Sequence, residues 1–139
     1  MKRPRVLLAD DNKILSERVA ELLSSCFEVV GIARDGRDLV SQAIFLTPDV
    51  IVSDISMPVL SGIEAAHDLR QLETTARFVF LTIHSEDEFL QACLEEGAAG
   101  YVVKSHMQAD LIPAIHSAMA GTIFVSPSLS RSDDIQQIV

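Results

Sequence analysis

The sequence predicts an α/β fold in which repeated strand–helix units build a doubly wound parallel sheet. Short apolar runs of strand type recur every 20 to 30 residues, and a stretch with helical periodicity separates each pair. Runs that are apolar throughout are typical of parallel strands buried on both faces. A chain of 139 residues with 48% hydrophobic content fits one such domain. The predicted strands end near Ala9, Ile32, Ser53, Thr82 and Val103.

Apolar residues three and four positions apart predict helices after the first two strands. They are Ile14, Leu15, Val19, Leu22 and Leu23 in the first helix and Leu39, Val40, Ala43 and Ile44 in the second. Three later helices carry capping-box sequences, in which two side chains satisfy free backbone N–H groups at a helix start. These are Ser61-x-x-Glu64, Ser85-x-x-Glu88 and Ser105-x-x-Gln108. Gly97 fits the position that follows the end of the fourth helix.

Pro113 interrupts the apolar spacing of the fifth helix. An interior proline loses a backbone hydrogen bond and clashes with the preceding turn, so this helix either begins near Asp110 or bends. After Gly121 the chain becomes rich in small polar residues without a sustained period. We therefore expect residues 1–122 to form one domain and residues 123–139 to be the start of a linker or a mobile tail.

Composition argues against several classes of function. Eleven basic residues against 20 acidic ones give a net charge of −9, which opposes direct binding of nucleic acid by this chain. The two cysteines, Cys26 and Cys93, have no CxxC spacing, which favours a reducing, cytoplasmic compartment over a disulfide framework or a zinc site. The apolar run at residues 6–9 is too short for an export signal or a membrane span, so no membrane attachment is expected.

Acidic residues follow two of the predicted strands. Asp10 and Asp11 come directly after the first strand, and Asp54 comes after the third. Open α/β sheets bind ligands at the carboxyl ends of their strands, so we expect these three side chains to converge. Each pair of like charges a few ångströms apart costs about 4 kcal/mol at an effective dielectric near 20, and a counter-charge is therefore needed. Mg²⁺, which takes carboxylate and water ligands, is the natural candidate.

Further polar groups are expected at the same edge of the sheet. Thr82 ends the fourth strand with a hydroxyl, Lys104 follows the fifth strand with a long ammonium side chain, and Pro58 fixes the loop after Asp54. Metal-binding acids, an acceptor carboxylate, a hydroxyl and a cation can together bind and stabilise a phosphoryl group. Transfer of that group depends mostly on positioning and on neutralising its oxygens.

The order and spacing of these residues resemble the receiver domain of two-component response regulators. The resemblance covers residues 5 to about 121, and the matching pattern is Asp10-Asp11, Asp54-x-x-Met57-Pro58-x-x-x-Gly62, Thr82 and Tyr101-x-x-Lys104. It implies a flavodoxin-like (βα)₅ domain with parallel strand order 2-1-3-4-5. Three further segments are similar to the NarL/FixJ subgroup, whose receivers precede a LuxR-type helix-turn-helix domain. They are Leu81-Thr82-Ile83-His84, Gly97-Ala98-Ala99-Gly100-Tyr101 and Ala120-Gly121…Val125-Ser126-Pro127.

The resemblance implies a role for each acidic residue. Asp54 would accept the phosphoryl group from the phosphohistidine of a sensor histidine kinase. Asp11, Asp54 and the backbone carbonyl of Ser56 would ligate Mg²⁺, and Asp10 would act partly through water. Lys104 would pair with Asp54 before transfer and with the phosphate afterwards.

The resemblance also implies roles at the ends of the fourth and fifth strands. Thr82 would bond a phosphoryl oxygen, and Tyr101 would turn inward when Thr82 moves. Ser56 and His84 would line the approach of water and tune dephosphorylation. The chain departs from many relatives in having Ser105, not proline, directly after the lysine.

Taken singly, these residues have ordinary explanations that compete with the functional ones. Asp10 and Asp11 are also suited to capping a helix, Thr82 to filling a strand, and Lys104 to the surface. The Tyr101 ring could pack on the sheet with its hydroxyl in water. His84 could be a loop histidine, His67, His106 and His116 are expected on helix surfaces, and Met57 and Cys93 are expected to pack.

The favoured function is a signalling switch that catalyses only its own phosphorylation and dephosphorylation and is not otherwise an enzyme. Its output is expected to be transcription, through a LuxR-type DNA-binding domain in the parent protein, with a homodimer as a further partner state. The alternatives are a stand-alone receiver acting on a protein partner, an interaction-only domain, and a Mg²⁺-dependent aspartyl-phosphate hydrolase of the haloacid dehalogenase type. The hydrolase family has a second Asp where this chain has Ser56.

Overall fold

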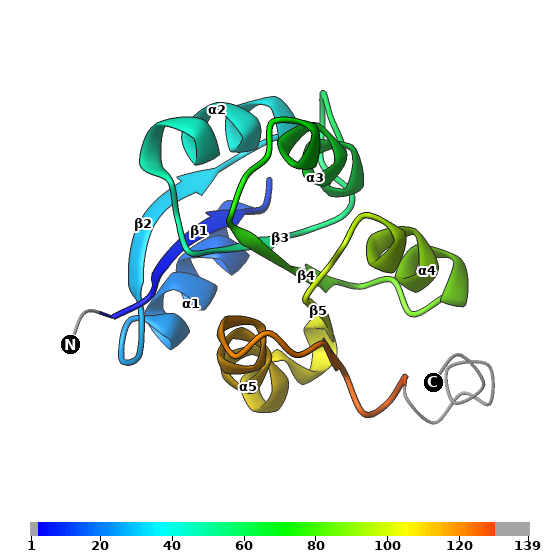
Figure 1. The fold of residues 1–139 in the computed structure, drawn as a ribbon. Coiled ribbons are helices and arrows are strands. Elements are labelled where there is room, and N and C mark those ends of the chain that lie inside the picture. Colours follow the sequence, from blue (N-terminus) through cyan, green and yellow to red (C-terminus); the bar gives the residue numbers. More distant parts are fainter. Residues whose placement is uncertain (1–2, 130–139) are drawn as a thin grey trace.

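A six-stranded parallel sheet lies between two layers of helices in the computed structural model, which describes residues 3–129 (Figure 1). The strand order is β2-β1-β3-β4-β5-β6, which confirms the predicted fold class and the order of the first five strands. The elements are β1 (Arg5–Ala9), α1 (Lys13–Leu23), β2 (Glu28–Ala33), α2 (Gly36–Leu46), β3 (Val50–Ser53), α3 (Gly62–Gln71), β4 (Arg77–Thr82), α4 (Asp87–Glu95), β5 (Gly100–Val103), a 3₁₀ turn (Lys104–His106), α5 (Met107–Met119) and β6 (Phe124–Val125).

Two hydrophobic cores lie on opposite faces of the sheet, because successive strand side chains point to alternate faces. On one face α1 and α5 contribute Leu23 and Ile115 (Figure 1). On the other face α2, α3 and α4 contribute Leu39, Leu69 and Leu90. All five side chains are buried, and burying each one fully contributes about 1.5–3 kcal/mol. This double packing fixes the strands, and with them the loops that follow the strands' carboxyl ends.

The short strand β6 lies within the segment that the sequence assigned to a linker start or tail. Phe124 and Val125 pair in parallel with Gly100 and Tyr101 of β5. Two residues are too few to show strand periodicity, which explains why the sequence did not reveal this strand. Residues 130–139 of the expected linker or tail lie outside the described residues.

The helix starts agree only in part with the predicted capping boxes. The box at Ser61 and Glu64 forms, with both hydrogen bonds at 3.1 Å. The predicted box at Ser85 is wrong, because α4 begins later, at Asp87. Its N-cap residue is Glu86, which makes no capping hydrogen bond through its side chain.

The start of α5 also differs from the prediction. Lys104–His106 form a 3₁₀ turn, so Ser105 lies inside that turn and not at the extended position that an N-cap needs. The helix begins at Met107, which makes the predicted start near Asp110 wrong. Pro113 therefore lies in the helix interior, on the exposed side. Water can satisfy the carbonyl that loses its helical partner there.

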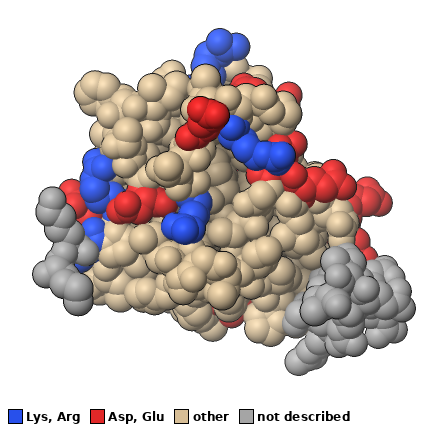
Figure 2. All heavy atoms as spheres, in the orientation of Figure 1, with Lys and Arg blue, Asp and Glu red and all other residues tan. Residues whose placement is uncertain are grey.

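Charged side chains of both signs are scattered over the upper and middle parts of the face in Figure 2, and a broad, mostly uncharged area lies below them, over α5. The sequence of α5 agrees with this view, since Asp110 is the one Asp, Glu, Lys or Arg residue in that helix. Within residues 3–129, no helix is both long enough and apolar enough to cross a bilayer.

Candidate functional site

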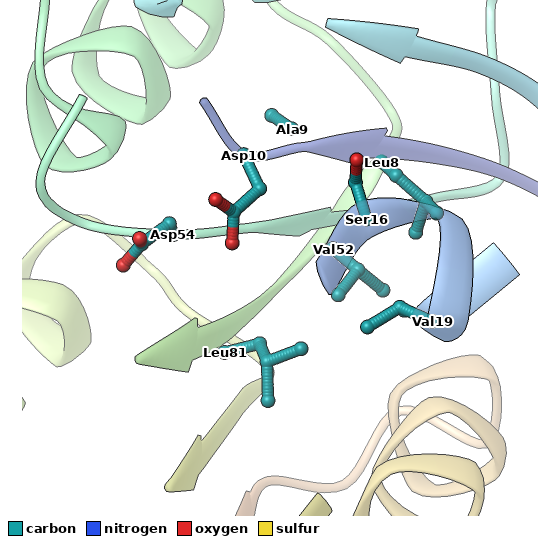
Figure 3. Close-up of a pocket in the computed structure, with 8 residues that line it drawn as sticks. All are labelled: Leu8, Ala9, Asp10, Ser16, Val19, Val52, Asp54 and Leu81. Carbon is teal, nitrogen blue, oxygen red and sulfur yellow. The ribbon is translucent and has the colours of Figure 1, made fainter. Parts of the chain in front are cut away.

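Three carboxylates lie together where β1 and β3 end. These two strands are neighbours in the sheet, so Asp10 and Asp54, which follow them directly, reach the same edge (Figure 3). One ligand atom each from Asp10, Asp11 and Asp54 lies within 4.8 Å of the others. Asp10 and Asp54 are buried, whereas Asp11 is exposed. Beneath the two buried acids is a small, mostly apolar pocket lined by Leu8, Ala9, Ser16, Val19, Val52 and Leu81.

Lys104 supplies a positive charge to this group of acids. Its Nζ atom lies 2.9 Å from Asp10 Oδ2 and 3.0 Å from Asp54 Oδ2. Burial alone lowers the pKa of this ammonium, but hydrogen bonds and charges from Asp10 and Asp54 outweigh it and raise the pKa above its ordinary value. The ammonium therefore stays charged at neutral pH. The explanation of Lys104 as an ordinary surface charge does not hold.

Backbone N–H groups fix the orientation of both buried acids. The N–H of Asn12 donates to Asp10 Oδ1 at 2.8 Å, and the N–H of Ile55 donates to Asp54 Oδ1 at 2.7 Å. Each carboxylate thus has one oxygen on the backbone and the other on Lys104. Asn12, and neither aspartate, caps α1. Sequence reasoning missed this residue, although asparagine before a helix is a known capping signal.

The donor set suits a hard divalent cation. All three side chains offer carboxylate oxygens, and the exposed Asp11 leaves one side open to water ligands. Three carboxylates and one ammonium carry a formal charge of −2, so Lys104 compensates only part of the negative charge. A divalent cation would balance the remainder.

Gly62 lies against the backbone at Asp54. A Cβ atom at this position would overlap the carbonyl oxygen of Asp54. The N–H of Gly62 also donates to the carbonyl of Ile55 at 2.8 Å. The spacing from Asp54 to Gly62 in the sequence is therefore a packing requirement, which lets the loop after β3 turn closely back over the site.

We expect Gly62→Ala to lower the free energy of unfolding by about 1–3 kcal/mol, because the backbone must move to admit the methyl group. The amide NMR signals of Asp54 and Ile55 should shift with it. Gly97→Ala is the control: Gly97 has φ +82° with open space around it, so that variant should lose stability without moving those signals. Unshifted signals at Asp54 in Gly62→Ala would show that this contact does not shape the site.

Thr82, His84 and Tyr101 form a connected group beside the acids. The Thr82 hydroxyl, at the end of β4, accepts a hydrogen bond from the His84 N–H at 3.2 Å. Tyr101 is fully buried and donates its hydroxyl to the His84 carbonyl at 2.8 Å. Burial raises the pKa of the Tyr101 phenol well above its usual value. The alternative that this hydroxyl remains in water is therefore wrong.

His84 also contacts the loop that follows Asp54. Its Nε2 atom lies 2.9 Å from the Ser56 hydroxyl, and its Nδ1 atom lies 3.7 Å from a Glu86 carboxylate oxygen. The imidazole stacks on Phe89 with ring centroids 4.0 Å apart. His84 is thus held on several sides and joins two loops at the edge of the sheet. Nothing in the sequence pointed to Phe89 as its packing partner.

The remaining candidates take the places expected for structural residues. His67, His106 and His116 are exposed. Met57 packs against the core on the α2–α4 side. Cys93 is fully buried, and burial raises the pKa of its thiol to about 12, which makes it unreactive at neutral pH.

Comparisons with known proteins agree on one family. Residues 6–116 match a family model described as "Response regulator receiver domain". Over 127 residues the chain is 34% identical to the nitrate/nitrite response regulator protein NarL of Escherichia coli (strain K12), covering 90% of this chain and 59% of that protein. The chain therefore spans only 59% of this relative's length.

Solved structures support the same relationship. A LuxR family two-component response regulator from Aurantimonas sp. SI85-9A1 superposes with a TM-score of 0.92 at 31% identity, covering 99% of this chain and 100% of that chain. A structure described as two RcsB dimers bound to two parallel DNAs superposes with a TM-score of 0.85 at 26% identity. That match covers 94% of this chain and 67% of that one.

Proposed function

Because the chain belongs to the response regulator receiver domain family, we propose that it is a phosphorylation switch in which Asp54 accepts a phosphoryl group. The observation that carries this proposal is the placement of the Lys104 ammonium between Asp10 and Asp54, with Asp11 alongside. This arrangement joins a carboxylate nucleophile to the cation and the metal-binding acids that phosphoryl transfer needs.

The chemistry proceeds at one oxygen of Asp54. This oxygen attacks phosphorus, the bond from phosphorus to the donor's histidine nitrogen breaks, and an acyl phosphate forms. Asp10, Asp11, Asp54 and the backbone carbonyl of Ser56 would hold Mg²⁺, which would neutralise phosphoryl oxygens. Lys104 exchanges its contact with Asp54 for one with the phosphate.

Two further groups respond to the new phosphate or limit its lifetime. The Thr82 hydroxyl gives up its bond with the His84 N–H and bonds a phosphoryl oxygen. Tyr101, whose hydroxyl donates to the His84 carbonyl, responds to the resulting movement of His84. The Ser56 hydroxyl and the His84 imidazole, 2.9 Å apart, stand beside the acceptor and tune the access of water. These contacts support the roles because they join the loop after β4 to Tyr101 of β5 and to the loop after β3.

The donor in this proposal is a sensor histidine kinase, and the output is transcription through a LuxR-type DNA-binding domain elsewhere in the parent protein. Support comes from the relative's greater length and from RcsB, which is described as dimers bound to DNA. With a net charge of −9, this chain is suited to contact a basic partner and not DNA itself. Pairing with a second copy is the further partner state, and action on a separate protein is the alternative output.

The test is intact mass measurement after incubation with Mg²⁺ and a small phosphodonor such as acetyl phosphate. The chain should gain the mass of one phosphoryl group, and chelating the metal with EDTA should prevent the gain. No gain in millimolar Mg²⁺ would contradict the proposal. Rapid release of many phosphates per chain would instead favour the hydrolase alternative.

A further inference from the structure

Ser126 is a fully buried polar residue that lies beyond the segment matched by the family. Its N–H donates to the Tyr101 carbonyl at 2.9 Å. Its hydroxyl accepts from the Val103 N–H at 3.1 Å and donates to Asp110 Oδ2 at 2.9 Å. One serine therefore bonds to β5 twice and to the first turn of α5 once. Figure 1 shows the segment that carries it leaving α5 and passing beside β5.

The bond to Val103 occupies the outer edge of β5. On its inner side, Val103 pairs with Thr82 of β4. On the outer side, β6 pairs with Gly100 and Tyr101, and within residues 3–129 no strand residue reaches the N–H of Val103. A buried backbone donor without a partner costs as much as a lost hydrogen bond. The Ser126 side chain takes the place of the missing strand residue and holds the last residue of β5.

We propose that Ser126 is a positioning residue of the site. Lys104 follows Val103 directly, so the bond that fixes the end of β5 also fixes the point from which the ammonium reaches Asp10 and Asp54. The bond from Ser126 to Asp110 ties the same point to α5. This inference builds on the proposed function, since it assigns residues after the matched segment to the support of the same site.

The proposal also has a consequence for regulation. The hold on Lys104 depends on the segment at residues 124–129 staying against β5. A partner that draws this segment away from the sheet would make the position of the Lys104 ammonium less fixed. By thermodynamic reciprocity, a change in the contacts of Lys104 would in turn alter how firmly the segment is held.

The test compares Ser126→Ala with Ser128→Ala in the 139-residue chain. Ser128 is exposed and lies two residues further along, so it controls for the loss of a serine in this segment. Without Mg²⁺, we expect the Val103 amide of Ser126→Ala to exchange with water roughly two- to tenfold faster. The ammonium protons of Lys104, followed by ¹⁵N NMR, should also exchange faster. Neither should change in Ser128→Ala.

The Lys104 signal separates positioning from a purely structural role. A structural role would speed exchange at Val103 alone, so an unchanged Lys104 ammonium would overturn the proposal. If Ser126→Ala does not fold, Ser126→Cys keeps the volume with a weaker hydrogen-bonding group and must show the same faster exchange. This test uses no phosphodonor, so its outcome does not depend on phosphorylation. If the Lys104 ammonium responds but the chain gains no phosphate in the separate mass measurement, the positioning role stands and only the proposed function fails.

Discussion

Asp54→Asn should abolish phosphoryl uptake while leaving the fold intact. Asparagine keeps the volume of the side chain, and its Oδ1 can still accept the N–H of Ile55, which lies 2.7 Å from the carboxylate oxygen. Lys104 keeps its contact with Asp10. The amide is a far weaker nucleophile than the carboxylate, so the rate of phosphorylation should fall by at least about a hundredfold. Intact mass after incubation with Mg²⁺ and acetyl phosphate measures the loss.

Asp68→Asn is the matched control for this variant. It makes the same chemical change at an exposed position on α3, away from the strand ends, and should gain phosphate like the unchanged chain. Circular dichroism should show equal helix content in all three proteins. A stable phosphate gain on Asp54→Asn would mean that another residue is the acceptor.

The convergence of the acids could be predicted because it follows from chain connectivity. Asp10 and Asp54 each follow a strand, and parallel neighbours in a doubly wound sheet bring their carboxyl ends to one edge. Thr82 and Lys104 reach the same edge for the same reason. The burial of β1 and β3 on both faces could also be predicted from the sequence, since residues 6–9 and 50–52 are apolar throughout.

Contacts that depend on side-chain packing could not be predicted in this way. Tyr101 is buried in the core that also contains Leu90 and Cys93 of α4, and its hydroxyl bonds the His84 carbonyl in the loop before that helix. Besides β4 and β6, β5 is bonded by Ser126, which comes from a segment with no strand signal in the sequence. Ser85 and Ser105 fit the capping pattern, but α4 begins at Asp87 and α5 begins at Met107. A capping pattern shows where a helix could begin, but it does not determine where the helix begins in the folded chain.

Lys104→Met should destabilise the chain in the absence of divalent metal. Methionine keeps the apolar stem but removes the charge that lies within 3.0 Å of both Asp10 and Asp54. Two buried carboxylates then face each other without a cation, and breaking a buried ion pair by removing one partner costs about 3–5 kcal/mol. These side chains retain some contact with water, so we expect a loss of about 3 kcal/mol, at the low end of that range. Urea unfolding followed by circular dichroism measures it.

Mg²⁺ should recover most of that loss, because the metal can take over as counter-charge and no longer competes with the ammonium. The stabilisation by millimolar Mg²⁺ should therefore be larger in Lys104→Met than in the unchanged chain. Lys13→Met, which removes an exposed lysine on α1, should lose little stability in either condition.

Lys104→Met should still accept some phosphate at Asp54, since Mg²⁺ neutralises the phosphoryl oxygens. In this variant, however, β5 lacks a group that bonds the new charge. The NMR shifts at Tyr101 on adding beryllium fluoride with Mg²⁺ should therefore be smaller in Lys104→Met than in the unchanged chain. Shifts of undiminished size would show that Lys104 takes no part in the switch.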